Sequence, residues 1–191
     1  MKLVLATTNP DKAREIEAIV GTTVDLVPRP ADVPEVEETG ATLLDNARLK
    51  AIALCSATGL PALADDTGLE VDALGGAPGV YSSRYAGEDA TYADNVRKLL
   101  DALAGRADRR ARFRTVALVR FPDGREVVGD GVVDGTIADA PRGDNGFGYD
   151  PVFVPDEGDG RTFAELTPDE KHAISHRGRA VRALAESLAE L

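Results

Sequence analysis

The chain has 191 residues, of which 43% are hydrophobic and 29% charged, as is typical of a soluble globular protein of one domain or of one domain with two lobes. Its formal net charge of -11 argues against a general binder of nucleic acids or membrane surfaces, although a metal ion or a local basic cluster could still hold a small anion. The single cysteine, Cys55, fits a reducing compartment, no apolar run is long enough to span a membrane, and the apolar run at the start is too short for a signal peptide.

The spacing of apolar residues, helix caps and turn residues predicts strands that mostly alternate with helices. In chain order, we expect a strand at 2–7, a helix at 10–20, a strand at 23–28, a loop at 29–40, a helix at 42–57, a strand at 60–65, a Gly-rich loop at 75–79, a helix at 91–104, strands at 110–121 and 126–138, a Gly-rich loop at 143–149, and two helices that follow Thr167 and Ser175. Pro122-Asp123-Gly124 predicts a hairpin between the two long strands. Because this hairpin interrupts the alternation, the sequence predicts an α/β protein with a mixed sheet rather than a plain doubly wound fold.

The first strand and helix are joined by the segment TTNPDK (7–12). A turn between a strand and a helix N-terminus is a ready site for an anion. The backbone N–H groups of Thr8 and Asn9 could face a phosphate there, and Lys12 would add positive charge. The glycines of a P-loop are missing. An ordinary capped helix with a solvated lysine is therefore the alternative interpretation.

The segment EETGATLLDNARLKA (37–51) places Glu37 and Glu38 before a helix. Asn46 and Lys50 are four residues apart, so they share one face of that helix. A carboxylate before the helix and a lysine along it could bracket a metal–phosphate complex. The alternative is a solvated acidic loop beside a surface lysine.

Two adjacent carboxylates, Asp65 and Asp66, follow the apolar residues LPALA. Ligands of α/β sheets usually bind at strand ends, and Mg²⁺ can neutralise paired carboxylates while it bridges to phosphates. One aspartate could then bind the metal while the other activates water, with Thr67 as a further donor. A polar turn is one alternative. The aspartic protease triplet DTG (66–68) is another, but the predicted helices fit that all-β fold poorly.

The segment GDNGFGYDP (143–151) holds Phe147 and Tyr149 between glycines, so that an aromatic ring could stack on a base. The alternative is a loop that its aromatic rings anchor to the core.

The segment ELTPDEKHAISHRGRA (165–180) holds Lys171, His176 and Arg177, which can donate to a keto or a phosphate oxygen. The alternative is a helix cap with exposed charges.

Taken together and in this order, these segments closely resemble the inosine/xanthosine triphosphate pyrophosphatases, a family that acts on non-standard purine nucleoside triphosphates. The resemblance runs from Thr7 to about Arg182, and ADDTGLEVDALGGAPGVYS and GFGYDP are its most specific parts. The first loop lacks the glycine that many members have before Asn9, and Thr67 stands where many have serine. Neither departure removes a proposed functional group.

The resemblance implies a single domain over residues 1–191 with an elongated, two-lobed α/β fold and the site in a cleft between the lobes. It implies a cytoplasmic homodimer that uses Mg²⁺ to hydrolyse ITP, dITP and XTP to the monophosphate and pyrophosphate, and so cleanses the nucleotide pool. It implies neither a nucleic acid polymer nor a membrane as partner.

The resemblance also implies a role for each matching residue. The triphosphate would be cradled by Thr7, Thr8, Asn9, Pro10, Asp11 and Lys12 and held by Lys50 and Lys171; Glu38 and Asp66 would bind the metal, with Asp66 also the catalytic base and Asp65 its support; Thr67 would touch the substrate; Phe147, Gly148, Tyr149 and Asp150 would flank the base; and His176 with Arg177 would read the purine. A related pyrophosphatase for modified pyrimidines or methylated nucleotides, or a nucleotide-binding sensor without turnover, remains as an alternative. The intact Asp66, Glu38 and Lys12 favour an enzyme.

Overall fold

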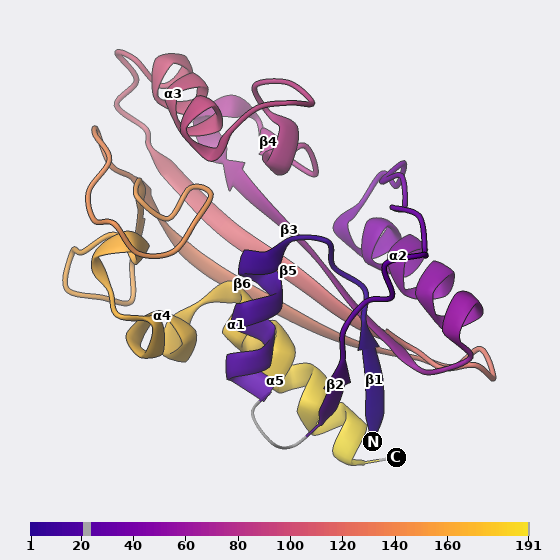
Figure 1. The fold of residues 1–191 in the computed structure, drawn as a ribbon. Coiled ribbons are helices and arrows are strands. Elements are labelled where there is room, and N and C mark those ends of the chain that lie inside the picture. Colours follow the sequence, from indigo (N-terminus) through magenta and orange to yellow (C-terminus); the bar gives the residue numbers. More distant parts are fainter. Residues whose placement is uncertain (21–23, 191) are drawn as a thin grey trace. The chain divides into compact units, whose positions relative to one another are not determined.

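The structure of the chain is a computed structural model that describes residues 1–20 and 24–190 (Figure 1). Its elements are β1 (Lys2–Leu5), α1 (Pro10–Val20), β2 (Asp25–Val27), α2 (Leu43–Thr58), β3 (Ala62–Val71), β4 (Pro78–Gly79), α3 (Tyr92–Ala102), β5 (Arg110–Arg120), β6 (Glu126–Ile137), β7 (Phe153–Pro155), α4 (Pro168–Ile174) and α5 (His176–Ala189), with short 3₁₀ helices at Asp72–Leu74, Ser82–Arg84 and Phe163–Glu165. The chain forms two compact units: unit 1 is Met1–Asp66, Thr115–Gly131 and His176–Leu191, and unit 2 is Thr67–Arg114 and Val132–Ser175.

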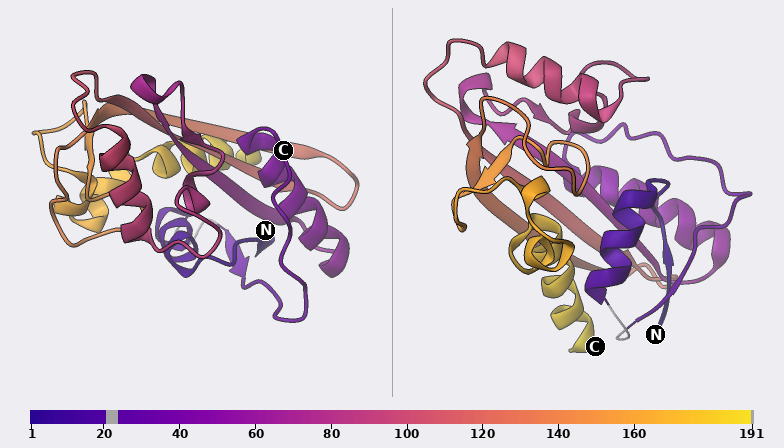
Figure 2. Two further views of the ribbon diagram at one scale, coloured as in Figure 1. Left: turned by 90° about the horizontal axis from the view of Figure 1, so that it is seen from above. Right: turned by 60° about the vertical axis from the view of Figure 1, so that its left-hand side comes forward.

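In unit 1, β1 pairs in parallel with β2 and with β3. Successive residues of a strand face opposite sides of the sheet, so β1 contributes to two cores. Leu3 and Leu5 pack with Ile16 of α1 and Val181 of α5, whereas Val4 and Ala6 pack on the side of α2. Helices α1 and α5 therefore cover one face of this part of the sheet and α2 covers the other (Figures 1 and 2).

Helix α5 lies unusually close to β6 in unit 1, because two strand residues there are glycines. A Cβ atom on Gly129 would overlap the backbone of Ala180 and Leu184, and one on Gly131 would overlap the backbone of His176 and Ala180. The first turns of α5 therefore rest directly on the strand backbone.

Unit 2 is built around antiparallel pairs and a cluster of aromatic rings. Here β3 pairs with β4, and β6 pairs with β7. The ring centres of Phe113 and Phe153 lie 4.7 Å apart, and those of Phe153 and Phe163 lie 5.1 Å apart. Leu99 of α3 joins this core.

The strands follow the order β2-β1-β3-β5-β6-β7, with β4 paired to β3. The predicted α/β fold class with a mixed sheet is thus confirmed, as are the hairpin between β5 and β6 and the separate final helix after Ser175. The predicted strand at 23–28 is shorter, since β2 spans Asp25–Val27, and Thr23 lies outside the described residues. The predicted strand at 60–65 is longer, because β3 continues through both aspartates to Val71.

Candidate active site

The loop before α1 has the cap that the sequence predicts. Asn9 Oδ1 accepts hydrogen bonds from the backbone N–H groups of Asp11 at 2.9 Å and Lys12 at 3.2 Å, and Thr7 Oγ1 accepts one from Asn9 N–H at 3.1 Å. The Thr8 hydroxyl donates to Glu35 at 2.8 Å. Of the two N–H groups predicted to face a phosphate, that of Asn9 thus bonds a side chain, so the clearest attraction for an anion at this loop comes from the ammonium group of Lys12.

The two adjacent aspartates lie inside β3 and are almost completely buried, with exposed fractions of 1% for Asp65 and 5% for Asp66. The expectation that the strand ends at these aspartates was wrong, because charged partners on other elements compensate both carboxylates and β3 continues to Val71. Lys12 Nζ lies 3.5 Å from Asp65 Oδ2 and 4.0 Å from Asp66 Oδ1. Arg177 Nε donates to Asp65, and Lys50 Nζ donates to Asp66.

Asp65 and Asp66 differ in the direction of their pKa shifts. Burial favours the neutral form of both carboxyl groups and would raise both pKa values. For Asp65, the nearby Lys12 and Arg177 outweigh burial and hold the pKa well below its usual range. For Asp66, burial outweighs Lys50 and Lys12, and the pKa lies above its usual value. Neighbouring carboxyl groups whose pKa values are shifted in opposite directions are typical of sites in which the two groups have different roles.

Two lysines complete this cluster in unit 1. Burial lowers the pKa of Lys12, in spite of the neighbouring Asp65. Burial would also lower the pKa of Lys50, but Asp66 and Glu38 favour the ammonium form more strongly and raise it. Lys50 Nζ lies 2.7 Å from Glu38 Oε1 and 3.3 Å from Asp66 Oδ1, so one cation is shared by two carboxylates.

The carboxylates that surround Lys50 are candidate ligands for a metal ion. In the part of the chain that the structure describes, no group of three or more His, Cys, Asp or Glu side chains could hold a metal ion. Glu38 and Asp66, however, already converge on a single cation. Mg²⁺ prefers oxygen ligands and is often bound by one or two carboxylates together with substrate phosphates. The pair fits a metal whose coordination is completed by a substrate.

Arg177 and His176 begin α5 and are both buried, with exposed fractions of 2% and 3%. The Arg177 guanidinium donates to Asp65 at 3.2 Å and also to Glu15 of α1. Two of its N–H groups thus bind carboxylates of the protein, a role that differs from the predicted reading of a purine. Sequence reasoning missed Glu15, although its position three residues after Lys12 places both on one face of α1.

The predicted base-flanking residues lie in unit 2, where Asp150 binds both Phe147, which is one of them, and Lys171. Its Oδ2 atom accepts from the backbone N–H of Phe147 at 2.8 Å and from Lys171 Nζ at 2.5 Å. Gly146, with a φ of 71°, makes room for this carboxylate, because a Cβ there would overlap Asp150 Oδ2. Lys171 is only 4% exposed and lies 5.1 Å from the centre of the Phe147 ring. The structure therefore places this lysine at an aromatic ring within unit 2.

Tyr149 belongs to the core of unit 2. It is 4% exposed, its hydroxyl donates to the carbonyl oxygen of Ser82 at 2.9 Å, and burial raises its pKa. Its side chain therefore anchors the loop to the core, as in the alternative interpretation, and its place beside a base stays a prediction. Two further predicted residues also lie in unit 2. Gly148 lines the cavity between α3 and the loop around Phe147, and Thr67 is half-buried at the start of the unit.

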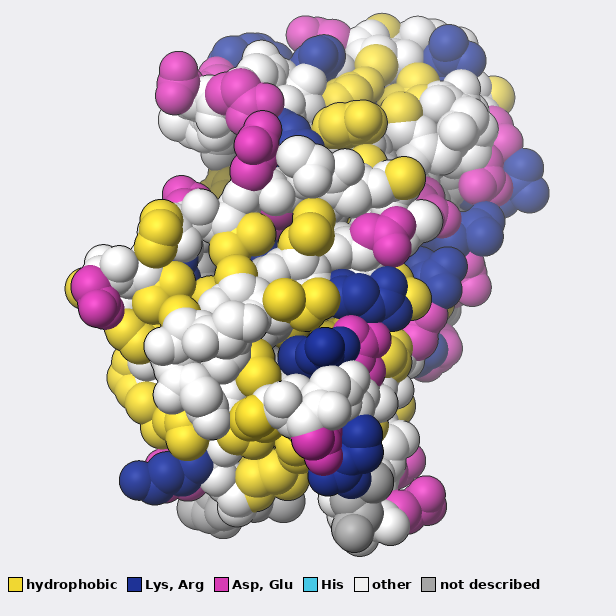
Figure 3. Space-filling model, turned by 90° about the vertical axis from the view of Figure 1, so that its right-hand side faces the viewer, with side chains coloured by type: hydrophobic (Ala, Val, Ile, Leu, Met, Phe, Trp, Pro, Cys, Tyr) yellow, Lys and Arg dark blue, Asp and Glu magenta, His cyan; other side chains and the backbone are white. Residues whose placement is uncertain are grey.

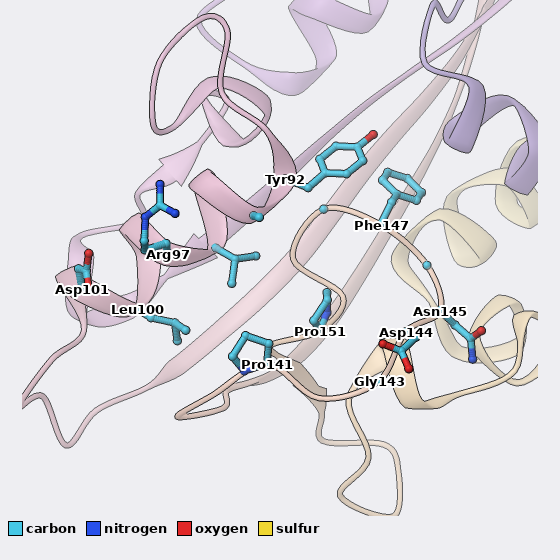
Figure 4. A pocket seen from close by; sticks show the side chains of 14 residues that line it. Tyr92, Arg97, Leu100, Asp101, Pro141, Gly143, Asp144, Asn145, Phe147 and Pro151 are labelled. Carbon is cyan, nitrogen blue, oxygen red and sulfur yellow. The ribbon is translucent and has the colours of Figure 1, made fainter.

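A cavity of about 570 Å³ lies in unit 2 between α3 and the loop around Phe147 (Figure 4). The rings of Tyr92 and Phe147 lie at its edge, with their centres 5.7 Å apart. Leu100, Pro141 and Pro151 contribute apolar surface. Phe147 thus has one side on a hollow that can take a flat apolar group.

The net charge of -11 does not produce an evenly negative surface. On the face shown in Figure 3, basic side chains lie directly beside acidic ones and among hydrophobic ones. Of the helices that the structure describes, none is long and apolar enough to cross a membrane.

The sheet, its helices and the buried cluster of carboxylates and lysines define the class of the protein: an α/β protein with a polar site suited to cations and anions. Residues 3–187 match the model of the Ham1 family, and the chain belongs to this family. The family expected from the sequence motifs is thereby confirmed.

Several relatives are similar over nearly their whole length. The dITP/XTP pyrophosphatases of Streptomyces avermitilis and Thermus thermophilus are each 50% identical to this chain; the matches cover 100% and 98% of this chain, and 98% and 91% of the relatives. Among solved structures, a HAM1 protein from Coxiella burnetii matches with a TM-score of 0.90 and 45% identity over 100% of both chains. The dITP/XTP pyrophosphatase from Mycobacterium abscessus matches with a TM-score of 0.77 and 46% identity over 98% of this chain and 100% of that one. The name dITP/XTP pyrophosphatase, which three of these four proteins carry, is that of a nucleoside triphosphate pyrophosphatase, the class of enzyme that the sequence predicts.

Proposed function

We propose that this chain hydrolyses the non-standard purine nucleoside triphosphates ITP, dITP and XTP to the monophosphate and pyrophosphate, and that it requires Mg²⁺. The observation that carries the proposal is the cluster of unit 1, in which Asp66 lies within 4.0 Å of both Lys12 and Lys50 and Lys50 also binds Glu38. A cluster that combines carboxylates with ammonium groups suits a metal–triphosphate complex. The names of the relatives supply the substrate class.

Asp66 is the proposed general base. Its carboxylate would accept a proton from the water that attacks the α-phosphorus, while the bond from that phosphorus to the bridging oxygen breaks and pyrophosphate leaves. Lys12 and Lys50 would offset the negative charge of the leaving group. Glu38 and Asp66 would hold Mg²⁺, which supplies further positive charge to the phosphate oxygens when it is bound. Asp65 supports this arrangement through its ion pairs with Lys12 and Arg177.

In unit 2, we assign Phe147 to stacking on the purine base, since its ring borders the cavity. Base–aromatic stacking is worth about 1–3 kcal/mol and tolerates any base, so Phe147 would support affinity more than choice. The reading of the 6-keto oxygen by His176 and Arg177 stays a prediction. Its test is the Arg177→Ala variant, in which loss of reading would narrow the ratio of kcat/KM for ITP to that for ATP.

The proposed assembly is a homodimer in the cytoplasm. Light scattering at micromolar concentration would then report about twice the 20.1 kDa mass of the chain. A particle of 20.1 kDa would contradict the dimer and leave the reaction itself unaffected.

The test of the reaction is a panel of ITP, dITP, XTP, GTP and ATP with Mg²⁺, in which pyrophosphate and orthophosphate are measured separately. We expect pyrophosphate as the first product from ITP, dITP and XTP, and no turnover when a chelator is in excess. Release of orthophosphate with a nucleoside diphosphate would contradict the proposed bond. Tight binding of ITP without any turnover would identify a sensor instead.

A further inference from the structure

Asn46 of α2 is completely buried, with an exposed fraction of 0%. Buried amide side chains are nearly always hydrogen-bonded, so the partners of Asn46 are informative. Its Oδ1 atom accepts from the backbone N–H of Gly40 at 2.7 Å. Its Nδ2 atom donates to Asp66 Oδ2 at 3.2 Å. One side chain thus connects the loop that follows Glu38 to the proposed catalytic base.

The orientation of the Asn46 amide follows from these two partners. The N–H of Gly40 is a donor and needs an oxygen, whereas the carboxylate of Asp66 is an acceptor and needs an N–H group. Only one of the two orientations of the amide meets both requirements. An aspartate at this position would offer Asp66 a second carboxylate, and a leucine would leave the Gly40 N–H without its acceptor.

The loop approaches α2 so closely that a side chain at position 40 would not fit. A Cβ atom on Gly40 would overlap Asn46 Oδ1, the backbone nitrogen of Asn46 and the Cβ of Asp45. The close approach therefore depends on glycine, and it brings the Gly40 N–H within reach of the amide.

Lys50 lies one helical turn after Asn46 and makes a second connection between the same partners. Its Nζ atom contacts Glu38 at 2.7 Å and Asp66 Oδ1 at 3.3 Å. Asp66 therefore has Asn46 at one oxygen and Lys50 at the other, so its carboxylate plane is fixed. Lys50 is charged and can be attracted by a phosphate, whereas the Asn46 amide is neutral and completely buried.

We infer that Asn46 is a positioning residue. It holds the loop at residues 38–40 against α2 and fixes the rotation of the Asp66 carboxylate. The catalytic consequence rests on the proposed function, but the hydrogen bonds themselves do not. Partners that orient ligating carboxylates typically change metal affinity or activity by about 10- to 100-fold when they are removed.

The experiment compares Asn46→Leu and Asn46→Asp with the parent chain. Hydrogen exchange of the Gly40 amide is measured by NMR without substrate. We expect it to be at least about tenfold faster in Asn46→Leu, because the acceptor is lost, and unchanged in Asn46→Asp, because a carboxylate oxygen can replace the amide oxygen. Both variants should lose about 10- to 100-fold in kcat for ITP with little change in KM, because both lack the donor to Asp66.

Asn95 in unit 2 provides the matched control. It is also buried, at 2% exposed, and it accepts from the N–H of Ala86 at 2.7 Å and donates to the carbonyl oxygen of Ser83 at 3.0 Å. Asn95→Leu should lower the thermal stability much as Asn46→Leu does, while kcat and Gly40 exchange stay as in the parent.

Three results would overturn the inference: parent-like Gly40 exchange in Asn46→Leu, parent-like kcat in Asn46→Asp, or an equal loss of kcat in Asn95→Leu. If Asn46→Leu does not fold, Asn46→Asp, which has nearly the same shape, decides through kcat. A chain that does not hydrolyse ITP would refute the proposed function, and the Gly40 exchange would still test the hydrogen bond.

Discussion

Arg177 of α5 donates from Nε to Asp65 Oδ2 of β3 at 3.2 Å, so a buried arginine neutralises the first of two neighbouring aspartates. The second, Asp66, binds Lys50, a lysine that it shares with Glu38. Adjacent carboxylates can therefore have different tasks, and substitution of each should have a different consequence.

We expect Asp66→Asn to lower kcat for ITP by about a hundredfold or more, because the amide keeps the shape of the side chain but is too weak a base to accept the proton. The fold should be kept, since the amide retains one acceptor oxygen, which Asn46 can use while Lys50 stays bound to Glu38. Steady-state kinetics together with a thermal melt would check both parts. Near-parental turnover would assign the base to another group.

The neighbouring substitution, Asp65→Asn, should act mainly on stability. It would remove one of the two carboxylates that compensate the buried Arg177 and the nearer of the two beside Lys12, so that Glu15 and Asp66 alone would remain for them. Removal of one partner from a buried ion pair costs about 3–5 kcal/mol. Urea unfolding of the two variants would measure the contrast, and equal stability of Asp65→Asn and Asp66→Asn would show that the division of tasks is wrong.

Substitution of Lys171 and of Lys50 would test which of these lysines binds the phosphates of the substrate. Its ammonium group binds Asp150 at 2.5 Å and lies over Phe147, so we expect Lys171→Met to raise KM for ITP and to leave inhibition by pyrophosphate unchanged. Lys50→Met, the matched variant in unit 1, should weaken that inhibition. If pyrophosphate binds more weakly to Lys171→Met, the lysine holds phosphates as the family resemblance implies.

Glu170 should give the stability a dependence on pH. Hydrogen bonds from Arg161 and from the N–H of Thr167 lower the pKa of Glu170 from 4.5 to about 2. Because the folded state favours the carboxylate, the stabilisation is complete above pH 4.5 and declines as the pH falls toward 2. Glu170→Gln should therefore melt below the parent at pH 7, and the two melting temperatures should converge at acidic pH. A constant difference across this range would contradict the assignment.

Much of the fold could be predicted because its signals are local. The helices predicted at 42–57, at 91–104 and after Thr167 are confirmed, and Thr42, Thr91 and Thr167 cap them by accepting from a backbone N–H group three residues further on. The shared helix face of Asn46 and Lys50 is a local signal as well, and both side chains indeed contact Asp66.

The charged partners of β3 could not be predicted in the same way. Aspartate disfavours strands, so the sequence indicates a strand that ends near Asp65. The compensation comes from Arg177, which is 112 residues away along the chain and is itself held by Glu15, 162 residues from it. Only the tertiary fold brings these three side chains together.

The closeness of α5 to β6 has a consequence for how substitutions in this chain are judged. Gly129 and Gly131 bear no chemical group, yet the helix that begins with His176 and Arg177 rests on the space that their missing side chains leave. Even a single methyl group at Gly131 would push against the first turns of that helix. If every position were substituted and the variants selected for activity, Gly129 and Gly131 should tolerate as few substitutions as the charged residues of the site. The cause would be the short distance between the helix and the strand, not a chemical role of the glycines.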